Sequence, residues 1–121
     1  MGVTIVGLGR GAAGQITREA WETLAGAREV HLRTRIHPSV PHLPEGPIYH
    51  SFDDLYETAE DFAQVYETIV ARLAGLAGQG GEVVYAVPGD PMVAEGTVTR
   101  LLAVCREKGV AAQVISGVSF I

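Results

Sequence analysis

The stretch of this sequence best placed to hold a ligand is Val87-Pro88-Gly89-Asp90-Pro91, which follows a run of apolar and mostly β-branched residues. In an α/β protein this pattern marks the carboxyl end of a buried parallel strand, where ligands bind in the crevice outside the strand ends. Gly89 lets the backbone come close to a ligand, and the two prolines stiffen the loop around it. The same residue types also make an ordinary strand-to-helix turn, so this loop alone leaves both interpretations open.

A second glycine-containing loop, Gly9-Arg10-Gly11-Ala12-Ala13-Gly14, matches the G-x-G-x-x-G pattern of dinucleotide-binding proteins. In those proteins, backbone N–H groups at a helix N-terminus bind the pyrophosphate. The pattern also needs an acidic residue about 20 positions further on, which binds the ribose. This sequence has Arg33-Thr34-Arg35 there, and basic residues suit the 2′-phosphate of NADP. A small NADP-binding module is therefore one open alternative.

Other reactive residue types lack the spacing that catalysis or metal binding requires. Glu57 and Glu60 are placed about one helical turn apart, and such a pair can hold Mg²⁺. A Mg²⁺-binding pyrophosphohydrolase needs a second acidic pair on a partner helix, and no E-x-x-D follows in this sequence. The four histidines show no metal-ligand spacing on one element, and His31 is expected to be packed within a strand. Cys105 lies on an apolar helical face and is expected in the core. We predict no metal site and no catalytic residue from these groups.

The bulk composition limits the class of protein. The chain has 121 residues, of which 47% are hydrophobic and 19% charged, and its net charge is −5. This is enough for one α/β domain with a core. An acidic chain without a basic cluster argues against a nucleic-acid-binding face. The single cysteine excludes a disulfide framework and fits a reducing cytoplasm. The sequence shows no signal peptide and no apolar run of about 20 residues, so no membrane segment is expected.

Hydrophobic periodicity predicts alternating strands and helices that position these loops. Apolar runs predict strands at 3–8, 30–33, 48–50, 82–87 and 111–115. Apolar residues at spacings of three and four predict helices over 17–27, over 55–76 as one continuous helix, and from 98 to near 109. Ser51 and Asp54 are expected to cap the long helix. Trp21 and Phe62 are expected to pack in or beside the core.

The order of these elements predicts the fold class. Strands that alternate with helices imply right-handed crossovers and an α/β, three-layer fold. We expect a five-stranded, mainly parallel sheet with helices on both faces. The strand that ends at Val87 should be central, because its near-continuous apolar run is typical of a strand covered on both faces. The segment 37–47 contains four prolines and is expected to be a long exposed loop.

Three segments, taken together and in this order, resemble the tetrapyrrole methylase superfamily, which uses S-adenosylmethionine. Val6-Gly7-Leu8-Gly9-Arg10-Gly11 resembles that family's V-G-x-G-P-G loop. Val87-Pro88-Gly89-Asp90-Pro91 resembles its G-D-P loop, and Ile115-Ser116-Gly117-Val118-Ser119 resembles its P-G-V-S segment. The family's methylase unit has two α/β domains with the cofactor between them. The resemblance implies that residues 1–121 are the first domain, and that the second domain is absent from this chain.

The resemblance also implies a set of cofactor contacts. Carried over by position, they are Pro88, Gly89, Asp90, Val93, Ser119 and Phe120, and Arg10 stands where the family usually has a cofactor-contacting proline. Arg33 occupies the place of an acidic catalytic base in uroporphyrinogen methylases. An arginine cannot accept a proton, so the resemblance implies no catalytic residue in this half.

Two further motifs resemble one branch of the family more closely, namely the methylase-like domain N-terminal to a MazG-type nucleotide pyrophosphohydrolase. They are Leu32-Arg33-Thr34 with His37-Pro38, and Ser51-Phe52-Asp53-Asp54-Leu55-Tyr56. This leaves two functions open beside the NADP module: half of a methyltransferase that is inactive alone, or a non-catalytic regulatory domain of such a fusion. The expected partners are the second methylase domain and, through exposed Val93, Phe120 and Ile121, a second copy of the chain.

Overall fold

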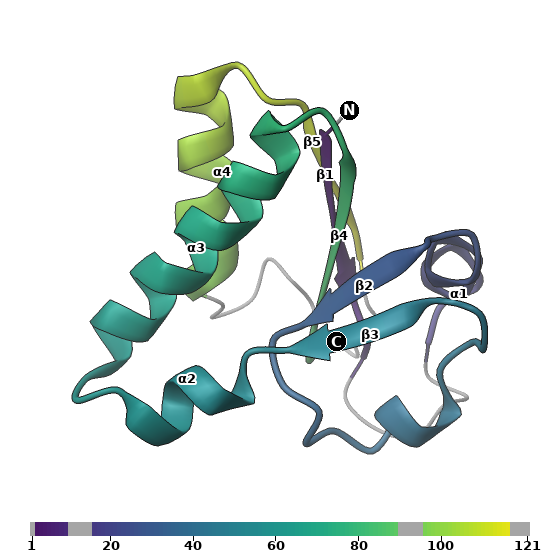
Figure 1. The fold of residues 1–121 in the computed structure, drawn as a ribbon. Helices are drawn as coiled ribbons and strands as arrows, with labels where there is room; N and C mark the ends of the chain where they lie inside the picture. Colours follow the sequence, from purple (N-terminus) through teal and green to yellow (C-terminus); the bar gives the residue numbers. More distant parts are fainter. Residues whose placement is uncertain (1, 10–15, 90–95, 117–121) are drawn as a thin grey trace.

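One five-stranded sheet forms the centre of the computed structural model, which describes residues 2–9, 16–89 and 96–116 (Figure 1). In chain order the elements are β1 (Gly2–Gly7), α1 (Arg18–Ala25), β2 (Glu29–Leu32), the 3-10 turn η2 (Val40–His42), β3 (Ile48–Ser51), α2 (Asp53–Thr58), α3 (Phe62–Gly78), β4 (Glu82–Val87), α4 (Gly96–Lys108) and β5 (Ala112–Ile115). Among the described residues, no helix has the length and apolar character needed to cross a membrane.

The sheet is parallel throughout its described pairings, and its strand order is β3-β2-β4-β1-β5. Strand β4 is therefore central, as its apolar sequence predicts. Its side chains alternate between two buried layers: Val83, Tyr85 and Val87 belong to one hydrophobic cluster, and Val84 and Ala86 to the other. Burial on both faces explains why this strand shows no polar alternation in its sequence.

Helices cover both faces of the sheet, which confirms the predicted three-layer fold. Helices α3 and α4 pack side by side on one face, where Ile69, Leu73 and Leu101 are fully buried in the larger cluster (Figure 1). On the other face lie α1, through Ala20 and Leu24, and the segment around η2. Because helices cover both faces, a ligand that contacts the central strands must approach from the ends of the strands.

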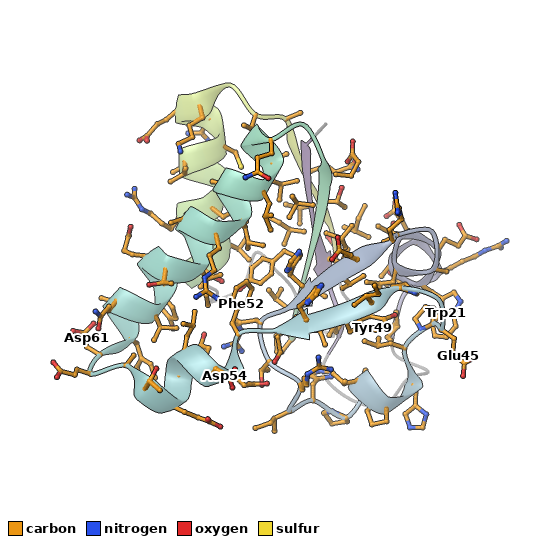
Figure 2. The ribbon with its side chains drawn as sticks, in the orientation of Figure 1. Trp21, Glu45, Tyr49, Phe52, Asp54 and Asp61 are labelled. Atoms are coloured by element: carbon orange, nitrogen blue, oxygen red, sulfur yellow. The ribbon has the colours of Figure 1, made fainter. Side chains whose placement is uncertain are left out.

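The predicted continuous helix over 55–76 is wrong, because the chain breaks between α2 and α3. Figure 2 shows Asp61 at this bend. Asp61 is the N-cap of α3, and its Oδ1 accepts a hydrogen bond from the backbone N–H of Gln64 at 2.7 Å. Ala59 ends α2 in an extended conformation. The cap satisfies a helix N–H that a continuous helix would bond internally, so the side chain of Asp61 starts a second helix.

Several smaller expectations also need correction. Ser51 belongs to β3, and the N-cap of α2 is Phe52, which makes no capping hydrogen bond with its side chain. Phe62 is 67% exposed and Trp21 40% exposed, so neither is a core residue. The proline-containing segment is not exposed throughout, because it includes η2 and the fully buried Ser39.

Two expectations about single side chains are confirmed. Cys105 is buried within the larger cluster, and burial raises the pKa of its thiol. A thiol with a raised pKa is mostly protonated and is a poor nucleophile. His31 is half-buried and stacks on His50, with ring centroids 5.1 Å apart, and on Phe52 at 6.2 Å.

The central strand is joined to α4 by a buried hydrogen bond, which yields a stability prediction. The Tyr85 hydroxyl lies 2.8 Å from Thr97 Oγ1, and both residues have no exposed surface. We expect Tyr85→Phe to lower the free energy of unfolding by about 1 kcal/mol, measured by denaturant unfolding. In the double variant with Thr97→Val, the loss should be smaller than the sum of the two single losses. Strict additivity would contradict a direct bond.

Candidate functional site

The three segments with ligand-binding patterns end at one edge of the sheet. Gly7, the last residue of β1, is in register with Val87, the last residue of β4. Val6 is in register with Ile115, the last residue of β5. The loops that follow these strands therefore start side by side. We call this side of the sheet, at the carboxyl ends of the strands, the carboxyl edge.

Strands β1 and β4 are neighbours whose connections leave to opposite faces. The chain passes from β1 into α1 on one face, and from β4 into α4 on the other. Such a topological switch point opens a crevice at the carboxyl ends of parallel strands, and ligands of α/β proteins bind there. The carboxyl edge between β1 and β4 is thus the candidate site.

Two glycines join the loops at this switch point. The backbone N–H of Gly9 donates to the carbonyl oxygen of Gly89 at 3.2 Å, and the N–H of Gly89 donates to the carbonyl oxygen of Gly9 at 2.7 Å. Both residues have positive φ values, 75° and 69°, which favour glycine. A Cβ built on Gly89 would meet no atom of the described residues within 4 Å. The pair thus joins the two loops, and no atom of the described residues fills the space beside Gly89.

A third segment, the loop of residues 33–39 after β2, contacts this glycine pair through His37. Its Nε2 lies 3.0 Å from the carbonyl oxygen of Gly9, and its Nδ1 accepts a hydrogen bond from the backbone N–H of Ser39 at 3.0 Å. The carbonyl oxygen of Gly9 therefore has two partners, His37 and Gly89. We call residues 33–39 the β2 loop.

The far end of the β2 loop is held by Asp53 at the start of α2. Asp53 Oδ1 accepts from Thr34 Oγ1 at 2.6 Å, and Oδ2 accepts from the backbone N–H of Arg35 at 2.9 Å. Partial burial alone would raise the pKa of this carboxyl, but hydrogen bonds from Thr34, Arg35 and Ser51 outweigh it and lower the pKa. Asp53 is therefore ionised at neutral pH and acts as a hydrogen-bond acceptor for the loop.

A further contact joins the ends of β5 and α1 at the same edge. The hydroxyl of Thr17, the N-cap of α1, lies 3.4 Å from the carbonyl oxygen of Ser116 and accepts from the backbone N–H of Ala20 at 3.1 Å. The segments after β1, β4 and β5 are thus brought to one edge, as the sequence motifs require.

The two arginines expected to bind an NADP phosphate contact other parts of the protein. Arg33 Nη1 lies 3.4 Å from the Tyr56 hydroxyl, and Arg35 Nη2 donates to the carbonyl oxygen of Tyr49 at 2.6 Å. In the dinucleotide-binding fold β1 and β2 are adjacent, whereas here β4 lies between them. Strand order and side-chain contacts therefore both argue against the NADP module.

The expected site residues fall into two groups. Pro88 and Gly89 lie at the carboxyl edge, where both are half-buried. The other expected residues lie outside the described residues: Arg10, Asp90, Val93, Ser119 and Phe120. Sequence reasoning assigned no role to His37 and Asp53, although both belong to the two motifs that resemble one branch of the family.

The acidic pair Glu57 and Glu60 does not form a metal site. Glu57 lies in α2, and Glu60 lies beyond its end in the turn before α3. The two carboxylates are therefore not one turn apart on a single helix. Within residues 2–9, 16–89 and 96–116, no three acidic, histidine or cysteine residues gather as metal ligands would.

Comparison with known proteins identifies the family. The model of the family "Tetrapyrrole (Corrin/Porphyrin) Methylases" matches residues 2–121. The chain belongs to this family. The tetrapyrrole methylase model covers all of the described elements, including the loops after β1, β4 and β5.

Individual tetrapyrrole methylase relatives are longer than this chain. The chain is 39% identical over 120 residues to the uncharacterized protein YabN of Bacillus subtilis (strain 168), with 98% of this chain and 24% of YabN covered. It superposes on uroporphyrin-III-C-methyltransferase of Thermus thermophilus with a TM-score of 0.72 and 32% identity, over 97% of this chain and 47% of that one. A Thermus thermophilus uroporphyrin-III C-methyltransferase complexed with S-adenyl homocysteine shares the fold, with a TM-score of 0.67 and 23% identity over 98% and 46% of the two chains.

The chain thus spans about a quarter of the YabN sequence and less than half of these methyltransferase structures. Over the aligned part of these methyltransferase structures, the fold predicted from the tetrapyrrole methylase resemblance is confirmed.

The glycine pair yields a prediction for Gly89. Gly89→Ala should lower the free energy of unfolding by about 1–2 kcal/mol, because an L-residue is strained at this positive φ. No steric clash with a described residue adds to this cost, since none has an atom within 4 Å of a Cβ built on Gly89. The matched control is Gly75→Ala, an exposed position in α3 with equally open space, which should raise stability by up to about 1 kcal/mol. Equal effects in chemical denaturation would contradict the backbone geometry.

The hydrogen bonds of Asp53 yield a prediction with a pH dependence. Asp53→Asn places an –NH₂ group opposite one of the two donors, the Thr34 hydroxyl or the Arg35 N–H. We expect it to lower the free energy of unfolding by about 1–3 kcal/mol at pH 7. Because the folded pKa is lowered, the stabilisation by Asp53 is complete above the unfolded value of about 3.9 and is lost as pH falls through the folded value. The difference between wild type and variant should therefore shrink below about pH 4.

The control for this prediction is Asp54→Asn, in the same first turn of α2 but exposed. It should change stability by less than about 0.5 kcal/mol. Unfolding curves measured from pH 7 down to pH 3 would contradict the role of Asp53 if both variants behaved alike.

Proposed function

We propose that this chain is the first domain of an S-adenosylmethionine-dependent methyltransferase and contributes one wall of its cofactor site. The observation that carries the proposal is the Gly9–Gly89 pair at the switch point between β1 and β4. Tetrapyrrole methylase membership and the similarity to uroporphyrin-III-C-methyltransferase support it. The fold shared with the structure that contains S-adenyl homocysteine also supports it.

The residues present fit such a cofactor. Gly9 and Gly89 have positive φ, and no described residue has an atom within 4 Å of a Cβ built on Gly89, so a ligand can approach the backbone closely. S-adenosylmethionine is a zwitterion with a sulfonium, and when bound it supplies an electrophilic methyl group. Tight loops suit it because their backbone N–H and C=O groups bind charged ends of both signs. Pro88 and Gly89 would hold the cofactor from the loop after β4.

We further propose that Arg10, Asp90, Val93, Ser119 and Phe120 complete the cofactor contacts of this wall. A second α/β domain would supply the opposite wall, and the partial coverage of the relatives is consistent with this. With one wall only, a ligand keeps much of its surface in water, whereas good sites bury most of it. We therefore expect these 121 residues to bind the cofactor weakly or not at all, and to transfer no methyl group on their own.

The position of Arg33 favours a second candidate function, a non-catalytic regulatory domain in a MazG-type pyrophosphohydrolase fusion. A methyl acceptor often must lose a proton. Arg33 cannot accept one, and Asp53 is a weak base because its pKa is lowered. In such a fusion the loops after β1 and β4 would bind a regulatory ligand without group transfer.

Ligand titration of the isotope-labelled chain tests the cofactor proposal. We expect any shift of amide resonances by S-adenosylhomocysteine to map to the segments 88–93 and 119–121, since these segments follow β4 and β5 in the sequence. NADPH serves as the comparison ligand, because it shares the adenosine part. If NADPH instead shifts residues 9–14 and 33–35, the methylase proposal fails and the dinucleotide alternative is correct. Micromolar affinity for S-adenosylhomocysteine in a monomer would contradict the half-site.

A further inference from the structure

We infer that His37 is a positioning residue of the cofactor site, acting through a single tautomer of its imidazole ring. The starting point is the geometry of its two nitrogens. The backbone N–H of Ser39 donates to Nδ1 at 3.0 Å, so Nδ1 carries no proton. A neutral ring then carries its proton on Nε2. Nε2 lies 3.0 Å from the carbonyl oxygen of Gly9 and donates to it.

The acceptor of this bond is also the acceptor that fixes the glycine pair. The carbonyl oxygen of Gly9 receives the N–H of Gly89 at 2.7 Å. A carbonyl oxygen has two lone pairs, so His37 and Gly89 together satisfy it. The ring of His37 therefore fixes the orientation of the Gly9 peptide, and through that peptide the position of Gly89.

His37 is itself held from both sides along the chain. On one side, Asp53 binds Thr34 and the backbone of Arg35, two to three residues before His37. On the other side, Ser39 has no exposed surface, and its N–H is bound to the His37 ring. The β2 loop thus brings the imidazole to a backbone 28 residues earlier in the chain. The segment that contains Thr34 and His37 thus meets the segment that contains Asp53.

Two substitutions separate the two hydrogen bonds of His37. In His37→Asn, the side-chain oxygen replaces Nδ1 and accepts from the N–H two residues on, but nothing reaches Gly9. In His37→Gln, the longer side chain places an –NH₂ donor near the position of Nε2 and gives up the bond to Ser39. A residue that only shapes its own turn is rescued by asparagine, whereas a residue that positions Gly9 is rescued by glutamine.

The first test needs no ligand. Nitrogen NMR of the wild-type histidines should show His37 with an unprotonated Nδ1 and a protonated Nε2. Hydrogen exchange of the Gly89 amide should be about 5- to 10-fold faster in His37→Asn than in wild type, the change expected for one hydrogen bond. In His37→Gln it should stay within about twofold of wild type. The opposite tautomer, or equal exchange in the two variants, would overturn the inference.

The second test rests on the proposed function, since it uses S-adenosylhomocysteine as the probe. His37→Asn should weaken its binding by about 5- to 10-fold, and His37→Gln should restore it. If the wild-type chain gives no response to this probe, the result agrees with the half-site, and the exchange data alone decide the role of His37. If the probe binds both variants and wild type equally, the positioning role is overturned and the cofactor site stands. The tautomer measurement in wild type keeps the inference testable if His37→Asn does not fold.

Discussion

The burial of β4 on both faces is the constraint on which the rest of the structure depends. Tyr85 has no exposed surface, and its neighbours along the strand alternate between two hydrophobic clusters. A strand of this kind must lie inside the sheet, with helices above and below. With β1 beside it and their following helices on opposite faces, the chain has a switch point between these two strands. The candidate site is thus a consequence of how the core is filled.

Sequence patterns predicted the features that depend on local chemistry. The apolar run of β4 and the glycines that follow β1 and β4 can be recognised from residue type alone. Burial on two faces selects apolar residues, and positive φ selects glycine. The break between α2 and α3 was missed because the apolar stripe stays in phase across it: Leu55, Ala59 and Val65 contact the same cluster. A local signal did exist, since Asp61 followed by Gln64 is the pattern of an N-cap.

The residues that hold the β2 loop could not be assigned from the sequence by any such rule. His37 contacts Gly9, and Asp53 contacts Thr34, only because the strand order brings the ends of β1, β2 and β3 to one edge. These contacts join side chains to a backbone or hydroxyl far along the chain, so neither periodicity nor turn composition indicates them. The two motifs described in the sequence analysis contain His37 and Asp53, but they assign no physical role to either residue.

Three described titratable groups near the carboxyl edge, Asp53, His37 and Arg33, form hydrogen bonds with other parts of the protein. The carboxylate of Asp53 accepts bonds from the loop, both nitrogens of His37 are engaged, and Arg33 contacts Tyr56. Groups that are engaged within the protein in this way are better suited to positioning a ligand than to exchanging protons with it. This agrees with the proposal that the described part of the carboxyl edge binds a ligand, under either the proposed methyltransferase or the proposed regulatory function. The two proposed functions would then differ in what a second domain supplies: an acceptor group and its base in the first, and no reacting group in the second.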